Sequence, residues 1–419
     1  MEVFFLESVK TILKAPWAYL KSLGKWILCA LTVGIFGGVI GSLFHKCIDF
    51  VTHVRLENGW LVFLLPVGSV LIFLLYGIFK KRGTLDTDRV FDSVSKDKDV
   101  PFVMAPLIFI SASITHLLGG SAGREGAALQ LGGAIGYRFA KALKMSKESV
   151  HTLVRAGMSA VFSALFGTPL AAAVFALEVV SVGTLPYSAM VPCFLSSATA
   201  FLVSTSMGVA PVRFLEVSFP EVTAGVLIQV LALAVLCALV SILFCVSIEK
   251  CKEGANKLLP NPYLRGFVGG AIVLGVTLLV GNQDYNGAGM NVIERAMAGE
   301  ARYEAFLLKI LFTAVSISAG FKGGEIVPAF FVGSTFGCVM GSILGLNASF
   351  GAAIGFVSVF CGAVNCPLAS IFLGVEVFGT DGALPMALAC AVSFMMSGRY
   401  SLYHSQSFLY SKLKEEKLQ

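Results

Sequence analysis

Uncharged stretches much longer than one membrane-spanning helix are the feature that most restricts how this chain can fold. Residues 326–375 contain no Asp, Glu, Lys or Arg, and residues 179–212 contain none either. A single helix across a bilayer needs only about 20 such residues. Gly, Pro and Ser interrupt both stretches, so we predict short helices that break and re-enter inside the membrane. Non-helical backbone survives at that depth only where it is buried in protein or lines a wet cavity.

The composition points to the same environment. Charged residues make up 13% of the chain and hydrophobic residues 56%, whereas soluble domains carry about 25% charged residues. A β-barrel is excluded because barrel strands alternate apolar and polar side chains, which these stretches do not. The net charge of +6 comes from Lys and Arg in short loops and at both ends, which is typical of membrane proteins and indicates no nucleic-acid partner. We therefore predict an all-α polytopic membrane protein.

Three further stretches have the length of a single crossing, namely Trp26–Phe44, Trp60–Phe79 and Thr223–Ile248. Basic residues cluster beside them and near the C-terminus, and positive charge favours the cytoplasmic side. The loop that carries Arg55 and Glu57 then lies outside. The clusters placed in the cytoplasm are Lys10, Lys14, Lys21 and Lys25; Lys80, Lys81 and Arg82; Lys250, Lys252 and Lys257; and Lys412 and Lys414.

The chain contains an internal repeat with an offset of about 200 residues (325 minus 125). Each half has a glycine-rich segment with a glutamate, and later a Pro-Leu-Ala segment followed by a second glutamate. The matched segments are Gly123-Arg124-Glu125-Gly126 with Gly323-Gly324-Glu325, and Pro169-Leu170-Ala171 and Glu178 with Pro367-Leu368-Ala369 and Glu376. Paired halves, frequently inverted, are typical of transporters, whose sites lie between broken helices. We predict membrane repeats over residues 26–220 and 221–406, flanked by cytoplasmic segments 1–25 and 407–419.

Glu125 and Glu325 each follow glycines and open an apolar, helix-like stretch. A helix N-terminus carries free N–H groups and partial positive charge, so two such ends aimed at one place bind an anion without Lys or Arg. The ionised carboxylate of Glu125 fits the same site and leaves it on protonation, which makes this residue a candidate gate and proton carrier. The alternatives are that Glu125 pairs with Arg124 or caps its own helix, and that Glu325 is a capping residue beside Lys322.

Other polar residues have more modest interpretations. Glu178 and Glu376 occur at matched positions, which favours a structural role such as accepting hydrogen bonds from buried backbone N–H groups. The phenol of Tyr403 can donate a hydrogen bond to an anion without neutralising it, although Tyr403 and Tyr400 also fit an interfacial aromatic belt. The five histidines have no metal-ligand spacing, and no nucleophile–base set or cofactor motif occurs. We therefore expect no metal, no cofactor and no enzyme activity.

In this order, the motifs resemble those of the CLC family of chloride channels and transporters, from about the first long span to Gln406. The resemblance implies a homodimer in which each subunit has its own pore, built from two inverted halves of many short, tilted and broken helices. It also implies that Glu125 is the external gate and that Tyr403 lies at the central anion site. Glu325 is expected to couple proton and anion movement. The residues expected to bind the ion are Thr87, Gly123, Arg124, Gly126, Gly324, Ile326 and Tyr403.

Departures from the usual family pattern resemble the bacterial fluoride-exporting branch. The central Ser of the family's GSGIP segment is missing from residues 83–90, where Thr87 is the candidate replacement. Ala127 stands in place of the Pro after the gate motif, and Glu325 lies in the segment that resembles G-x-F-x-P. Val179 stands where the chloride antiporters have an internal proton-transfer Glu.

The resemblance therefore implies a proton-coupled antiporter that exports fluoride across the bacterial inner membrane. Its partners are then fluoride, protons and the lipid bilayer. A chloride/proton antiporter or chloride channel of the same fold is the alternative. A membrane scaffold without transport is a third hypothesis, but a scaffold needs no carboxylates at helix breaks.

Overall fold

The computed structural model describes residues 2–79 and 85–412, with side chains described from residue 17 onward. The basic residues at 80–82 and Lys414 lie outside the described residues, and so does most of the predicted tail. Lys10 and Lys14 lie on the first helix, but their side chains are also outside the description. The predicted division into segments and their membrane sides stays a prediction.

The first half is a series of helices with one short strand. Its elements are α1 (Glu2–Glu57), the 3-10 helix η1 (Gly59–Leu64), α2 (Leu65–Ile78), α3 (Thr87–Ser95), α4 (Met104–Leu118), α5 (Glu125–Ala142), α6 (Lys147–Phe166), α7 (Pro169–Glu178), β1 (Ser181–Val182), the 3-10 helix η3 (Tyr187–Ala189) and α8 (Met190–Ser206).

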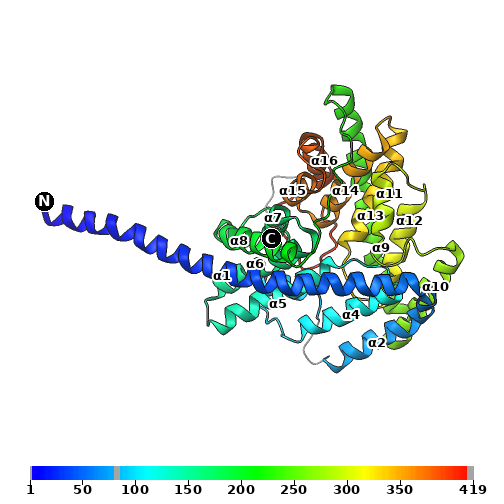
Figure 1. The fold of residues 1–419 in the computed structure, drawn as a ribbon, viewed down its shortest axis with the longest axis horizontal. Coiled ribbons are helices and arrows are strands. Elements are labelled where there is room, and N and C mark those ends of the chain that lie inside the picture. Colours follow the sequence, from blue (N-terminus) through cyan, green and yellow to red (C-terminus); the bar gives the residue numbers. More distant parts are fainter. Residues whose placement is uncertain (1, 80–84, 413–419) are drawn as a thin grey trace.

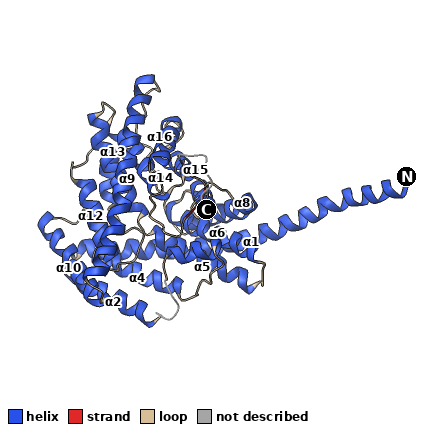
Figure 2. Cartoon of the chain, turned by 180° about the vertical axis from the view of Figure 1, so that it is seen from behind, coloured by secondary structure: helices blue, strands red, loops and turns tan. Residues whose placement is uncertain are grey.

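The second half has the same character, and its strand β2 pairs in parallel with β1 of the first half. Its elements are α9 (Ala224–Leu258), α10 (Pro262–Val280), α11 (Met290–Met297), α12 (Ala305–Ser318), α13 (Ile326–Ile343), α14 (Ala348–Val364), α15 (Pro367–Phe378), α16 (Ala383–Met396) and β2 (Ser407–Phe408). Figure 2 shows that helices form nearly the whole molecule, and Figure 1 shows the N-terminal part of α1 extending away from the other helices.

The long uncharged stretches break into short helices, which confirms that part of the prediction, while their re-entry inside the membrane stays a prediction. Residues 326–375 form α13, α14 and most of α15, and residues 179–212 include β1, η3 and α8. Asn365 ends α14 in the left-handed conformation (φ 58°), and Pro367 opens α15 at a position where a missing N–H costs nothing.

The predicted single crossings are helical but have different limits. Trp26–Phe44 lies inside the much longer α1, and Thr223–Ile248 coincides with the start of α9, which continues to Leu258. Both helices continue because the polar residues that follow the apolar stretch include no proline. The stretch Trp60–Phe79 is divided between η1 and α2, because Pro66 opens a new helix.

The lengths and hydropathy of the helices fit a bilayer. Within the described residues, seven helical segments are long and apolar enough to cross a membrane. They are Tyr19–Glu57, Gly59–Ile78, Lys147–Phe166, Tyr187–Ser206, Ala224–Leu258, Pro262–Val280 and Ile326–Ile343. Shorter apolar helices lie between these spans or after the last of them, among them α4, α12 and α14. The fold is thus an all-α membrane fold of many short helices.

Close glycine contacts join equivalent helix pairs in the two halves. In the first half α5 packs on α6, where a Cβ atom on Gly132 would lie 2.1 Å from the carbonyl oxygen of Gly157. In the second half α13 packs on α14, where a Cβ atom on Gly355 would lie 2.1 Å from the carbonyl oxygen of Gly333. The internal repeat therefore extends from the motifs to the packing of the helices behind them.

Glu178 and Glu376 connect the halves reciprocally. Each carboxylate lies near the end of one helix and accepts two backbone N–H groups from the first turn of the other. Leu368 (3.1 Å) and Ala369 (2.8 Å) of α15 donate to Glu178, while Leu170 (2.9 Å) and Ala171 (2.8 Å) of α7 donate to Glu376. This exchange confirms the structural interpretation of both residues and fits two halves that run in opposite directions.

We expect Gly355→Ala to destabilise the protein, because its methyl group would overlap the backbone of α13. Overpacking of this kind costs about 1–3 kcal/mol. The matched control is Gly275→Ala in α10, where nothing lies within 4 Å of the added Cβ atom. The control should leave stability unchanged or raise it, since Ala is the better helix former. Thermal unfolding of the detergent-solubilised variants measures the difference, and equal melting temperatures would contradict the packing account.

Candidate functional site

Two backbone hydrogen bonds between Gly123 and Gly324 join the halves at the glutamate-containing motifs. The N–H of Gly123 donates to the carbonyl of Gly324 (2.7 Å), and the N–H of Gly324 donates to the carbonyl of Gly123 (2.8 Å), as an antiparallel bridge. A Cβ atom on Gly324 would lie 2.3 Å from the backbone nitrogen of Gly126. The absence of side chains here lets the first turns of α5 and α13 approach each other.

Glu125 is fully buried at the first position of α5. One carboxylate oxygen accepts the backbone N–H of Arg124 (3.0 Å), and the other accepts the N–H of Val327 in the first turn of α13 (3.2 Å). The carboxylate of the first half thus occupies a helix N-terminus of the second half, where an anion is favoured.

The two alternative interpretations of Glu125, an ion pair with Arg124 and a cap of its own helix, do not account for these contacts. The guanidinium of Arg124 pairs with Asp49 (3.1 Å), so Arg124 gives Glu125 only its backbone N–H. The contact with Val327 crosses to the other half, so Glu125 is more than a cap of its own helix.

Glu325 is the residue just before α13 and makes no side-chain capping hydrogen bond. Lys322 does not compensate it, because its ammonium lies 4.6 Å from the ring centroid of Tyr76, and no ion pair joins Lys322 to Glu325 among the described residues. The capping interpretation of Glu325 therefore lacks its hydrogen bond. Instead, Glu325 borders a cavity of about 130 Å³, which we call the inner cavity.

Thr87 and Tyr403 border the same inner cavity as Glu325. The Tyr403 side chain is buried, and its ring packs edge-on against Phe91 (centroids 5.0 Å apart). Its hydroxyl has no hydrogen-bond partner among the residues that the structure describes. A buried hydroxyl without a partner is unusual and fits a donor held ready for a ligand. Tyr400 is exposed, so the two tyrosines that the sequence left ambiguous have different environments.

Gln130 contacts this site and was missed by the sequence reasoning. Its amide nitrogen donates to the hydroxyl of Thr87 (3.2 Å), and this hydroxyl donates to the carbonyl of Gly126 at the long distance of 3.4 Å. The amide oxygen of Gln130 is buried without a partner. A polar residue inside an apolar helix five positions after Glu125 was the available signal.

A second and larger cavity of about 590 Å³ is bordered by Val327 in the first turn of α13, and we call it the outer cavity. Val327, whose N–H holds Glu125, borders it, as do Arg55, Arg124 and His116. His116 is buried, and its Nε2 lies 3.4 Å from the carbonyl oxygen of Gly123.

The residues predicted to form the site thus separate into three groups around one bridge. Those at the facing helix ends are Gly123, Glu125, Gly126, Gly324 and Ile326; those at the inner cavity are Thr87, Glu325 and Tyr403; and the side chain of Arg124 faces the outer cavity.

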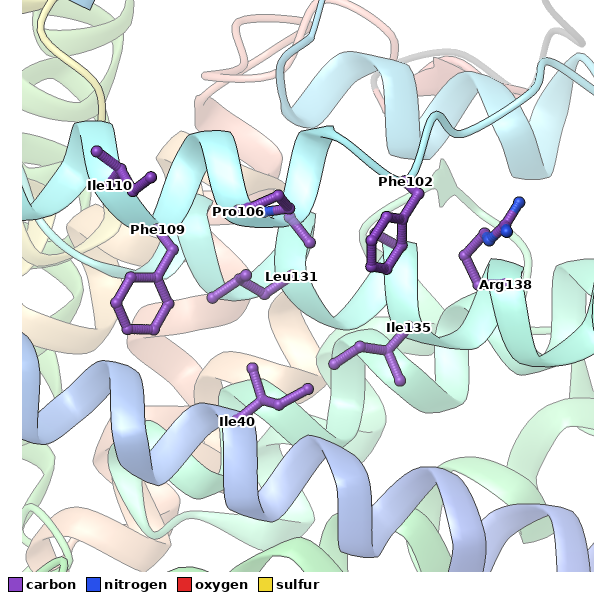
Figure 3. A pocket seen from close by; sticks show the side chains of 10 residues that line it. Ile40, Phe102, Pro106, Phe109, Ile110, Leu131, Ile135 and Arg138 are labelled. Carbon is purple, nitrogen blue, oxygen red and sulfur yellow. The ribbon is translucent and has the colours of Figure 1, made fainter.

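A separate pocket of about 330 Å³ lies between α1, α4 and α5 (Figure 3). Its lining is apolar, as at Phe109 and Leu131, except for Arg138 at one end. None of the predicted site residues lines this pocket. It offers no convergent polar groups to an ion, so the inner and outer cavities are the better candidates for an ion path.

Comparison with known proteins gives a consistent result. The family model described as voltage gated chloride channel matches residues 68–398. A chloride/fluoride channel protein of Pseudomonas syringae pv. tomato is 33% identical over 93% of this chain and 88% of its own length. The H(+)/Cl(-) exchange transporter ClcA of Vibrio cholerae is 24% identical over 94% of this chain and 91% of its own length.

Solved structures extend the likeness to three dimensions. The crystal structure of a CLC-type fluoride/proton antiporter matches with a TM-score of 0.88 and 31% identity, over 93% of this chain and 98% of that one. A slow cyanobacterial Cl-/H+ antiporter matches with a TM-score of 0.77 and 19% identity, over 89% and 94% of the two chains. This chain therefore belongs to the CLC family of ion channels and transporters, not to a family of enzymes, and is a multi-pass protein of the inner membrane.

Proposed function

We propose that this protein is a proton-coupled antiporter that exports fluoride across the bacterial inner membrane. The observation that carries the proposal is the position of Glu125, whose buried carboxylate accepts the backbone N–H of Val327, a residue of the opposite half that borders the outer cavity. Such a carboxylate competes with an anion for the same N–H groups. Protonation removes its charge and weakens its hold on those donors, so proton binding and anion passage become linked.

The inner cavity supports fluoride as the anion. Fluoride is small and strongly hydrated, so its site has to supply short, strong hydrogen bonds in place of water. The hydroxyl of Tyr403 has no other partner, and a protonated Glu325 would be a second donor in the same cavity. Chloride is larger and gains less from such donors.

Glu325 is also the best candidate for the inward proton route. Val179, where the chloride antiporters carry a glutamate, is fully buried and apolar. Two other carboxylates border the inner cavity, but both are engaged locally. Asp86 accepts the N–H of Arg89 as the cap of α3 (3.2 Å), and Asp88 accepts the N–H of Ser405 (2.9 Å). Among the described residues, no other residue donates a hydrogen bond to the Glu325 carboxyl, so we infer that it is the group that exchanges a proton.

The relatives support fluoride without excluding chloride. The relative at 33% identity is named for both ions, and the solved structure at 31% identity is a fluoride/proton antiporter. The more distant relatives include chloride exchangers, so a chloride/proton antiporter is the second candidate. The proposal includes a homodimer with one ion path in each subunit, as the family resemblance implies.

Efflux from proteoliposomes loaded with either fluoride or chloride tests the choice of anion. We expect fluoride to leave well before chloride under matched gradients, because the inner cavity offers hydrogen-bond donors suited to the smaller ion. An ion-selective electrode records each anion, and protein-free liposomes give the leak. Equal or faster chloride efflux would assign the protein to chloride transport. If neither anion left the vesicles, the hypothesis of a membrane scaffold without transport would be favoured.

The gate variant is Glu125→Gln, which keeps the shape of the side chain but removes the exchangeable proton. In proteoliposomes with equal fluoride on both sides, an acidic outside should drive fluoride out of wild-type vesicles against its own gradient. We expect Glu125→Gln to abolish this uphill movement whatever it does to passive flux. Glu221→Gln in an exposed loop is the matched control. Persistent uphill movement in Glu125→Gln would remove this residue from the coupling step.

The second coupling variant is Glu325→Ala. Because Glu325 is the uncommitted carboxylate at the inner cavity, its loss should slow coupled fluoride efflux by about tenfold or more, the effect of one strong hydrogen bond. Glu300→Ala, at an exposed loop position, controls for loss of a carboxylate as such. If coupled fluoride efflux by Glu325→Ala equalled that of the wild type, Glu325 would have no role in coupling.

A further inference from the structure

Arg55, near the end of α1, has an unusual environment. Its side chain is only 3% exposed, and its buried Nε and Nη1 atoms have no hydrogen-bond partner within the described part of the chain. The residue borders the outer cavity. Buried charges in proteins are normally paired, because an unpaired one carries the full cost of leaving water. The transport mechanism described above makes no use of Arg55.

A second buried cation lies beside it. The ammonium of Lys309 is fully buried and donates only to backbone carbonyls, those of Gly287 (2.7 Å) and Tyr285 (3.1 Å). Gly287 separates the two cations, because a Cβ atom at this position would lie 2.9 Å from Nη1 of Arg55. Among the described residues, no carboxylate forms an ion pair with either Arg55 or Lys309.

The carboxylates that border or adjoin the outer cavity do not pair with Arg55. Asp49 is held by Arg124 (3.1 Å) and His45 (2.8 Å). Asp284 is held by Arg295 (2.6 Å). Glu294 is exposed, and Glu57 lies 3.4 Å from His53. The outer cavity therefore contains a guanidinium whose charge and N–H groups are both unmatched.

We propose that Arg55 forms an anion-binding site in the outer cavity, which takes a small monovalent anion of the halide class. A guanidinium holds an anion well in a buried site, since it is weakly hydrated and offers several donors in a fixed plane. Lys309 adds positive charge from behind Gly287. Because Val327 borders the same cavity, an anion released from the helix ends at Glu125 next meets Arg55.

The role of this site in export rests on the proposed function of the protein as a fluoride exporter. An ion that passes the gate loses the backbone N–H groups and is not yet fully hydrated. A cation at this point lowers the free energy of the ion before it reaches bulk water. The same cation also attracts external anions, so anions outside should compete for the site and slow export.

Bromide is the probe for the site itself, because its anomalous scattering locates it in crystals. In wild-type crystals grown in bromide we expect an anomalous peak within hydrogen-bond distance of the Arg55 guanidinium. Arg55→Gln should lose this peak, and removing a buried unpaired charge should not impair folding. Arg295→Gln is the control, since it removes a paired arginine near the same cavity and should keep the peak. No peak in the wild type, or an unchanged peak in Arg55→Gln, would overturn the proposal.

A transport assay tests the use of the site. With a fixed outward fluoride gradient, external chloride should slow efflux from wild-type proteoliposomes relative to gluconate at equal ionic strength. We expect the chloride concentration for half-inhibition to rise about tenfold in Arg55→Gln and less in Arg55→Lys, which keeps the charge. If the chloride concentration for half-inhibition rose equally in Arg295→Gln, the effect would come from the overall positive charge around the cavity, and a local site at Arg55 would be refuted. Rapid chloride transport by the wild type would instead contradict the proposed fluoride selectivity, while the bromide result would still stand.

Discussion

The paired backbone hydrogen bonds between Gly123 and Gly324 are the contact on which the rest of the site depends. They are made by two residues without side chains, so the ends of α5 and α13 come close enough for a carboxylate of one half to reach an N–H group of the other. The glycine contacts behind them, between α5 and α6 and between α13 and α14, hold these helix ends in place. A side chain at the bridge would separate the halves and leave both helix ends unfilled.

The same fold uses buried carboxylates in two ways. Glu178 and Glu376 each accept two N–H groups across the halves, which satisfies both the carboxylate and the helix start. Such groups stabilise the fold and have no reason to move. Glu125 accepts one N–H from each half, and Glu325 makes no capping hydrogen bond. Glu325 borders the inner cavity, and Val327, which donates to Glu125 from the second half, borders the outer cavity.

Much of this arrangement could be predicted from the sequence, because it follows from motif spacing. The repeat, the helix starts at the two glycine-rich motifs and the structural role of Glu178 and Glu376 all come from residue type and position. The apolar stretches Trp26–Phe44 and Thr223–Ile248 lie in helices that span a membrane by length, but they do not give the ends of α1 and α9, because both helices continue into polar residues. Gln130 and Arg55 were missed as site residues for a different reason. Their importance comes from unpartnered atoms, and partners are a property of packing that no linear pattern records.

The central claim is that fluoride and protons move in opposite directions through one gate. The most direct test follows internal pH while fluoride leaves wild-type proteoliposomes down its gradient, with the membrane potential clamped by potassium and valinomycin. Antiport predicts that the interior becomes acidic as fluoride leaves. Leakage of neutral HF makes the interior alkaline, so protein-free vesicles separate the two effects. Protein-dependent loss of fluoride with no acidification would contradict the account.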